Sequence, residues 1–270
     1  MIQILTVATV IAVGVAVLAG PAASRLVPVA HSRIWLGGGI FLLTEALLLF
    51  GIFEPRAPLF GRIFWRGPRD RRAITLTFDD GPSEPYTSEI LDILKSSGVT
   101  ATFFPIGRNA AAFPDTIQRA AAEGHEIGNH TYDHDLLPLR SASRIRDQVG
   151  RTSALIETIT GRRPRFFRAP HGWRNPWVNR AVRATGCEPV AWTLGVWDTD
   201  RPGTDIIVER TRKGLRNGCV LLLHDGRGTE RGADASQVVA ALPKIIDEAH
   251  RAGYSFVGLS DMMTRAETVR

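Results

Sequence analysis

From residue 73 onward the chain alternates short apolar runs with amphipathic segments, and this alternation constrains the fold more than any other feature. Short apolar runs are typical of strands, and the amphipathic segments between them are typical of helices. Expected strands cover residues 73–79, 100–105, 125–129, 165–169, 188–194, 219–224 and 254–258; expected helices cover residues 86–97, 114–123, 141–160, 176–185, 204–216 and 236–252. Strand followed by helix, repeated about seven times, predicts a parallel α/β sheet with helices outside, closed or nearly closed into a barrel.

Prolines and glycines mark several expected helix ends. Pro114 and Pro176 stand in first turns, where no helical hydrogen bond is lost, and Gly161 and Gly186 follow helix ends, where the left-handed conformation is common. Pro243 lies inside the last expected helix. Because proline removes a backbone hydrogen bond, a kink or break is predicted there.

Two adjacent carboxylates, Asp79 and Asp80, end the apolar run of residues 73–78. Neighbouring side chains on a strand point to opposite faces, so the strand must end here if both carboxylates share one site, and Gly81 permits the turn. Close acidic groups resist joint ionisation unless a cation lies between them. A metal site is therefore predicted, although an aspartate pair at a strand end also serves as a turn or helix cap.

Two histidines, His130 and His134, follow the third expected strand. Histidines four residues apart project from one face of a helical turn and can bind one ion together. With Asp80 they make a set of two histidines and one carboxylate that leaves open positions for water and substrate.

Arg168, Asp198 and His224 also fall at or just beyond expected strand ends. In parallel folds with helices outside, the chemistry lies at the C-terminal ends of the strands. These side chains are therefore expected at the same edge as the aspartate pair.

The motifs around these residues resemble those of the polysaccharide deacetylases that carry the NodB homology domain, which form carbohydrate esterase family four. The resemblance spans roughly residues 70–262, in five places that keep the family's order. They are Asp79-Asp80, His130 to His134, Arg168-Ala169-Pro170-His171-Gly172, Trp192 to Asp198, and Leu222-Leu223-His224-Asp225. The resemblance implies a distorted (β/α)7 barrel of the NodB homology type.

The same resemblance implies a hydrolase that removes N-acetyl groups from amino sugars of a polysaccharide, peptidoglycan or lipid-linked glycan. A divalent metal, in this family usually Zn²⁺, would activate water and polarise the carbonyl. The metal ligands would be Asp80, His130 and His134. Asp79 would act as the general base and Arg168 would orient it, in principle by a fork of hydrogen bonds.

On the opposite side of the expected site, His224 would act as the general acid and Asp198 would hold it charged. Leu222 and Leu223 would offer one side chain to the acetyl methyl group. The backbone after Pro170 would supply an N–H for the oxyanion. At that position His171 replaces the family's usual tyrosine.

The fourth motif departs from the family pattern of two aspartates three residues apart followed by tryptophan. Its positions hold Gly195, Asp198 and Thr199, so the first carboxylate and the trailing ring are lost. Trp197, together with Trp192 and Trp173, could still stack on sugar faces. The departure bears on the identity of the substrate rather than on the reaction.

Two uncharged or nearly uncharged apolar stretches, residues 2–20 and 34–53, are each about long enough to span a bilayer as a helix. Residues 21–33 between them hold prolines and arginines and suit a short exposed turn. We therefore expect residues 1–53 to form a membrane anchor of two transmembrane helices. Alternatively residues 1–23 form a cleaved signal peptide, although they lack a positively charged leader.

The rest of the chain is expected to comprise a basic juxtamembrane linker at residues 54–72, a catalytic domain at 73–262 and a polar tail at 263–270. At 270 residues and 44% hydrophobic content the chain can bury one sizeable core. The net charge of +6 comes mostly from scattered arginines, with one dense run at residues 62–72. That run fits anionic membrane lipid better than nucleic acid, so no nucleic-acid partner is expected. The sequence alone does not indicate the oligomeric state.

Two arguments conflict on which side of the membrane the catalytic domain lies. Arginines after the second apolar stretch outnumber Arg25 and Arg33 before it, and the positive-inside rule then places the domain in the cytoplasm. Most substrates of the family's anchored members lie outside the membrane. On that ground we expect a bacterial inner-membrane protein with an extracytoplasmic catalytic domain.

Other functions compete with deacetylation. The same framework supports a deformylase of a lipid-linked amino sugar. An inactive sugar-binding membrane protein would not need both a base and an acid, and an iron oxygenase, which shares the ligand set, would not need the paired histidine acid. The binding protein and the oxygenase are weaker alternatives for that reason, and the deformylase is the nearest rival.

Overall fold

The computed structural model describes residues 27–230 and 232–268, and the chain divides into two compact units after Phe53. The first unit holds helix α2, Val27–Phe53. Its stretch Trp35–Phe53, with a mean hydropathy of 2.0, is long and apolar enough to cross a membrane. Residues 27–33, expected in a turn, are helical instead. The other expected span, residues 2–20, lies outside the described residues.

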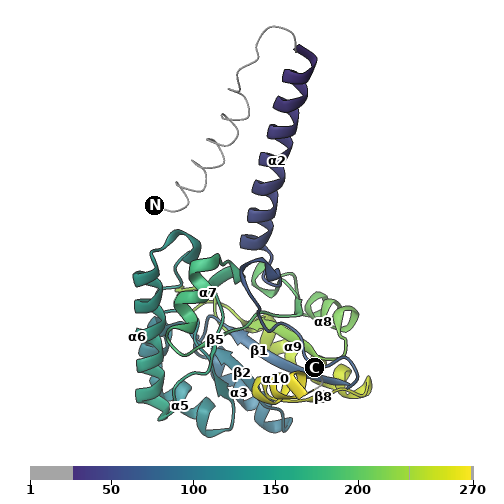
Figure 1. Ribbon diagram of the computed structural model, residues 1–270. Coiled ribbons are helices and arrows are strands. Elements are labelled where there is room, and N and C mark those ends of the chain that lie inside the picture. Colours follow the sequence, from purple (N-terminus) through teal and green to yellow (C-terminus); the bar gives the residue numbers. More distant parts are fainter. Residues whose placement is uncertain (1–26, 231, 269–270) are drawn as a thin grey trace. The chain divides into compact units, whose positions relative to one another are not determined.

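The second unit, from Glu54 onward, is built on a parallel sheet (Figure 1). Its strand order is β3-β2-β1-β7-β6, and β8 pairs with the start of β1. The bounds are β1 Ala73–Asp79, β2 Ala101–Phe104, β3 Glu126–Ile127, β6 Leu194–Gly195, β7 Cys219–His224 and β8 Ser255–Phe256. All of these pairs are parallel, which confirms the α/β class with a parallel sheet.

A second parallel pair joins β4, Phe166–Phe167, to β5, Glu188–Pro189. A bridge between Asn129 and Phe167 connects it to the end of β3. The expected strand 188–194 is split into β5 and β6, because the residues between them turn to pair with the segment before β1: Val190 bridges Phe64. Closure into a (β/α)7 barrel stays a prediction.

The six expected helices are all present, within two residues of their predicted ends. They are α3 Tyr86–Ser96, α5 Pro114–Ala122, α6 Ala142–Thr160, α7 Pro176–Arg183, α8 Thr204–Gly214 and α9 Ser236–Arg251. Local caps explain some of these ends: the Ser141 hydroxyl accepts the Arg144 N–H at the start of α6, and Gly161 ends it with φ 72°. Helix α9 continues through Pro243, so the expected break is absent.

Two helices were not expected from the sequence, α4 at Gly107–Ala112 and α10 at Leu259–Thr268. Single-turn helices add η1 Pro58–Phe60, η2 Leu137–Leu139, η3 Pro170–Gly172 and η4 Asp198–Asp200. Helix α10 extends into the expected polar tail, and Met263 is buried there. The second unit therefore continues past residue 262.

The expected linker, residues 54–72, belongs to the second unit and packs on its other residues. The buried Arg174 guanidinium donates hydrogen bonds to the carbonyls of Pro55 and Ala57. Arg66 donates to the Asn217 carbonyl at 3.1 Å. The basic run thus begins inside the folded unit.

Strand β1 lies at the centre of the core, and every one of its residues is buried. Its apolar side chains pack in one cluster with those of β7 and with helices α3 and α9. The register pairs Asp79 with Phe104 on β2 and with His224 on β7. Because all three strands run in the same direction, their carboxyl ends form one edge, which holds the candidate site.

Candidate active site

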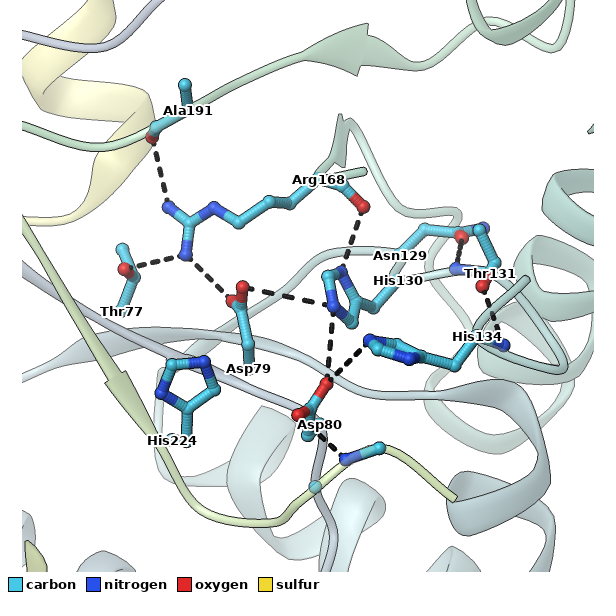
Figure 2. A network of polar contacts seen from close by, with 12 residues as sticks. Thr77, Asp79, Asp80, Asn129, His130, Thr131, His134, Arg168, Ala191 and His224 are labelled. Carbon is cyan, nitrogen blue, oxygen red and sulfur yellow. Dashed lines mark hydrogen bonds and ion pairs between the residues drawn. The ribbon is translucent and has the colours of Figure 1, made fainter. Parts of the chain in front are cut away.

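Asp79 and Asp80 both lie at the end of β1 and are both buried. Asp80 takes a left-handed conformation with φ 77°, whereas Asp79 still pairs with its strand neighbours. A residue in this conformation leaves the strand, so its side chain need not point away from that of Asp79. Figure 2 shows both carboxylates facing His130. The expected strand end is confirmed, and it occurs at Asp80 itself, one residue before Gly81.

His130 and His134 converge on a single oxygen of Asp80. Their Nε2 atoms lie 3.3 Å and 3.2 Å from Asp80 Oδ1 (Figure 2). The ligand atoms of these three residues all lie within 4.8 Å of one another, close enough to hold one metal ion. The structure therefore brings together the three residues that the sequence predicted as ligands.

The histidines come from an irregular loop, not from the helical turn that the spacing suggested. Thr131 and His134 have positive φ angles of 68° and 57°, which a helix does not allow. Local hydrogen bonds hold the loop: Asn129 Oδ1 accepts the Thr131 N–H at 2.9 Å, and Thr131 Oγ1 accepts the His134 N–H at 3.1 Å. Side-chain acceptors thus replace helical bonds.

The donor set fits a divalent cation. His130 Nδ1 lies 2.9 Å from the Arg168 carbonyl, and because a carbonyl only accepts, Nδ1 carries a proton and Nε2 is the nitrogen left to bind a metal. Asp80 Oδ2 accepts the Gly228 N–H at 2.8 Å, but Asp80 Oδ1 is buried without a hydrogen-bond donor. Such an atom is costly unless a cation or donor satisfies it.

The electrostatics agree with an anionic Asp80. Burial by itself raises the pKa of Asp80, but hydrogen bonds from His130 and His134 and the positive charge of a protonated His130 outweigh it and hold that pKa well below its usual range. A carboxylate that stays charged while facing two imidazole nitrogens is the ligand arrangement that zinc accepts.

Arg168 orients Asp79 from the side opposite the histidines. Its fully buried guanidinium donates through Nη1 to Asp79 Oδ1 at 2.7 Å and to Thr77 Oγ1 at 2.8 Å. Nη2 donates to the Ala191 carbonyl at 3.1 Å. The expected fork on Asp79 is wrong, because the second nitrogen is used elsewhere. Asp79 Oδ2 therefore has no bond from Arg168 and lies 4.0 Å from His130 Nε2.

His224 stands at the end of β7 against Asp198. His224 Nδ1 lies 3.0 Å from Asp198 Oδ1, and Asp198 Oδ2 accepts the His224 backbone N–H at 2.8 Å. Burial lowers the pKa of His224, but the buried carboxylate of Asp198, helped by the charges of Asp80 and Asp79, outweighs it and raises that pKa to about 10. The imidazole is therefore protonated, and its Nε2 is free of Asp198.

Strand alternation decides between the two leucines before His224. Leu222 shares the face of His224, since it is two residues away, and Gly195 on β6 is its partner in the register. Leu223 is fully buried in the main core with Ile74 and Phe78. Of the two predicted substrate contacts, the structure keeps Leu222 beside the site and places Leu223 in the core.

Aromatic rings line the rim of the site. His171, exposed and with φ 57°, packs edge-on against the ring of His134 at 4.9 Å, and Trp173 follows at 5.2 Å. Trp197 is 70% exposed next to Asp198. Trp192 is instead half-buried, and its ring fills the space where a side chain at Gly172 or Gly195 would stand. The aspartate that the family has at position 195 would meet this ring.

Sequence reasoning missed Asn109 and Asp225, which both contact the turn at Asp80. Asn109 Nδ2 donates to the Asp80 carbonyl at 2.7 Å, and Asp225 Oδ1 accepts the Gly81 N–H at 3.1 Å. Asp225 had a signal, since it closes the fifth motif directly after His224. Asn109 had none, because it lies on a short helix with no distinguishing pattern.

Comparison with known proteins identifies the class that this fold and site define. The family model for polysaccharide deacetylase matches residues 66–190. A peptidoglycan-N-acetylglucosamine deacetylase of Bacillus cereus is 35% identical over 208 residues, which cover 75% of this chain and 93% of the relative. A chitooligosaccharide deacetylase of a Bradyrhizobium species is 39% identical, over 68% of this chain and 87% of the relative.

Solved structures agree with the sequence comparisons. The crystal structure of the Bc1960 peptidoglycan N-acetylglucosamine deacetylase superposes with a TM-score of 0.70 at 34% identity, over 74% of this chain and 92% of that one. The chain therefore belongs to the polysaccharide deacetylase family, the NodB-type carbohydrate esterases. It is a hydrolase of that family.

Proposed function

We propose that the protein is a membrane-anchored, metal-dependent deacetylase of N-acetylated amino sugars in a glycan. One observation carries the metal dependence: the buried, donorless Oδ1 of Asp80 faces the Nε2 atoms of His130 and His134. A divalent ion such as Zn²⁺, held by these three residues, would act as a Lewis acid and lower the pKa of a water molecule.

Asp79 is the proposed general base. Arg168 occupies Asp79 Oδ1, which leaves Oδ2 to take the proton of the attacking water. The hydrogen bond from Arg168 also fixes the orientation of the carboxylate. This division of the two oxygens gives the base one orientation.

His224 is the proposed general acid. Asp198 holds Nδ1, so Nε2 would deliver its proton to the departing sugar nitrogen as the carbon–nitrogen bond breaks. The proton taken by Asp79 and the proton given by His224 balance the hydrolysis into acetate and a free amine. The backbone N–H of His171 would stabilise the oxyanion between them.

The substrate is proposed to be a glycan of N-acetylglucosamine, as in the names of the relatives that act on peptidoglycan and chitooligosaccharides. Leu222 would contact the acetyl methyl group, and the exposed ring of Trp197 would stack on a sugar face. Helix α2 would anchor the protein in the bacterial inner membrane among its lipids. The catalytic unit is proposed to be extracytoplasmic because peptidoglycan, on which one relative acts by name, lies outside that membrane.

Acetate release by the purified full-length chain tests the proposal. Peptidoglycan, chitooligosaccharide and lipid-linked substrates, each in N-acetyl and N-formyl form, would be compared with and without a chelator. We expect acetate release that chelation abolishes and zinc restores. Release that survives both chelation and His130→Ala would contradict metal dependence, and a preference for the formyl substrates would favour the deformylase.

A further inference from the structure

The metal-binding carboxylate of Asp80 depends on a disfavoured backbone conformation. Asp80 has a φ of 77°, a region that residues other than glycine rarely adopt. Such conformations persist only where the surrounding structure enforces them. The contacts that enforce this one therefore also decide where the Asp80 oxygens point.

One amide group, that of Asn109, joins the backbone of Asp80 to that of Gly228, which in turn binds the Asp80 carboxylate. Asn109 Nδ2 donates to the Asp80 carbonyl at 2.7 Å and to the Gly228 carbonyl at 3.1 Å. The N–H of the same Gly228 donates to Asp80 Oδ2 at 2.8 Å. Asn109 therefore fixes the Asp80 backbone and, through Gly228, the orientation of its carboxylate.

Asp225 holds the other end of the turn. Its Oδ1 accepts the Gly81 N–H at 3.1 Å, its Oδ2 accepts the Thr87 hydroxyl at 2.8 Å, and its own N–H donates to the Asp79 carbonyl at 3.2 Å. The fit is close, because a Cβ at Gly226 would lie 2.7 Å from the Asp80 carbonyl oxygen. Residues 225–228 therefore pack directly on the turn at Asp80.

These contacts satisfy the carbonyl and Oδ2 of Asp80 and leave only Oδ1 without a donor. We propose that Asn109 and Asp225 are positioning residues that hold Asp80 so that Oδ1 is the metal ligand. The proposal rests on the metal site of the proposed function. Neither residue touches the ion or the substrate; each acts through the backbone of the aspartate pair.

Zinc affinity of the full-length protein tests the role of Asn109. Competition with a chromophoric zinc chelator would measure the dissociation constant of the metal-depleted protein and of Asn109→Ala. We expect the variant to bind zinc about 10–100-fold more weakly, the range for residues that orient metal ligands. Saturating zinc should restore much of its kcat, because the reacting groups are intact.

Asn179→Ala is the matched control. Asn179 is also buried, and its side-chain amide also donates to a backbone carbonyl far away in the sequence, that of Phe60 at 2.8 Å. It makes one such bond where Asn109 makes two, and it belongs to α7, outside this network. Both variants are expected to lose stability, which thermal unfolding of the metal-depleted proteins would measure. Only Asn109→Ala should lose zinc affinity; equal affinity in the two variants would overturn the proposal.

A second variant covers the case in which Asn109→Ala does not fold. Thr87→Val keeps the shape of the side chain but removes the donor to Asp225 Oδ2, and Thr87→Ser restores it. We expect weaker zinc binding in the valine variant and recovery in the serine variant, and unchanged affinity in both would overturn the role of Asp225. If the unmodified protein and His130→Ala bind zinc equally poorly, the metal site itself is wrong, a failure distinct from these.

Discussion

Replacing Asp198 by asparagine is expected to move the alkaline limb of the pH–rate profile to lower pH. Burial lowers the pKa of His224, and the Asp198 carboxylate raises that pKa to about 10. Asparagine keeps the size of the side chain and can still accept the His224 N–H, but it carries no charge. The pKa of His224 is then expected to fall toward its ordinary value of ~6.5, because burial still lowers it while the more distant charges of Asp80 and Asp79 still raise it.

The size of the effect follows from the protonated fraction of His224. With a pKa of about 10, nearly all of the imidazole is charged at pH 7. With a pKa of ~6.5, roughly a quarter is charged at pH 7 and roughly 3% at pH 8. Since only the charged form can act as the acid, kcat/KM should fall roughly fourfold at pH 7 and roughly 30-fold at pH 8, beyond any loss of orientation.

The assay is kcat/KM for acetate release across the pH range, with NMR titration of His224 in the metal-depleted protein as a direct readout. A bound divalent ion lowers the pKa of His224 in both proteins. The prediction is therefore the difference between the alkaline limbs of the unmodified protein and of Asp198→Asn, not the position of either one. Asp200→Asn is the control, because Asp200 is an exposed carboxylate in the same turn. An unchanged alkaline limb in Asp198→Asn would refute His224 as an acid held by Asp198.

The same pair makes a prediction about stability. The folded pKa of His224 lies above its unfolded value, so the pair contributes fully to the free energy of unfolding below pH ~6.5. That contribution is lost as the pH rises through about 10. Denaturant unfolding of Asp198→Asn should therefore lose less stability over this interval than the unmodified protein does.

Three further predictions concern the metal, the base and the membrane. Elemental analysis should find about one divalent ion per chain, and His130→Ala should lose most of it; equal metal content would exclude the site. Asp79→Asn should keep the metal but lose turnover by ~10²–10⁴, and a rate above a tenth of the original would exclude Asp79 as base. For the membrane side, a cysteine at exposed Ser143 is preferable to one at Ser141, which caps α6. Labelling of Ser143→Cys by an impermeant thiol reagent on intact cells is expected; protection until lysis, with the variant folded, would place the unit in the cytoplasm.

The sequence predicted the regular elements of the catalytic unit because their signals are local. Strand β1 reads as a continuous apolar run, and α6 begins at a Ser141 cap and ends at Gly161, so each is defined within its own residues. Helix α10 was missed because it follows β8 directly and has no N-terminal capping motif of its own: the Glu126 side chain, distant in sequence, accepts the Leu259 and Ser260 N–H groups.

The site shows the same division. His130 and His134 were identified from their spacing, yet that spacing suggested a helical turn. Their actual loop depends on acceptors from Asn129 and Gln148, and Gln148 lies on a helix later in the chain. Similarly, the predicted pair of hydrogen bonds from Arg168 to Asp79 is not formed, because Nη2 of Arg168 donates to the Ala191 carbonyl instead. No local sequence pattern connects Ala191 to Arg168.

By itself the sequence determined which residue types stand at the carboxyl ends of the strands, because each strand is recognisable from its own residues. Parallel strands end at one edge of the sheet, so these residues were expected to lie together. That was enough to place the candidate residues at one edge and to suggest the ligand set, whereas the roles of base and acid came from the family resemblance and stay proposals. Only the tertiary structure decided which oxygen of Asp79 and which oxygen of Asp80 are left for chemistry. Those choices depend on donors such as Arg168, Asn109 and Gly228, which reach the aspartates only when segments far apart in the chain pack together.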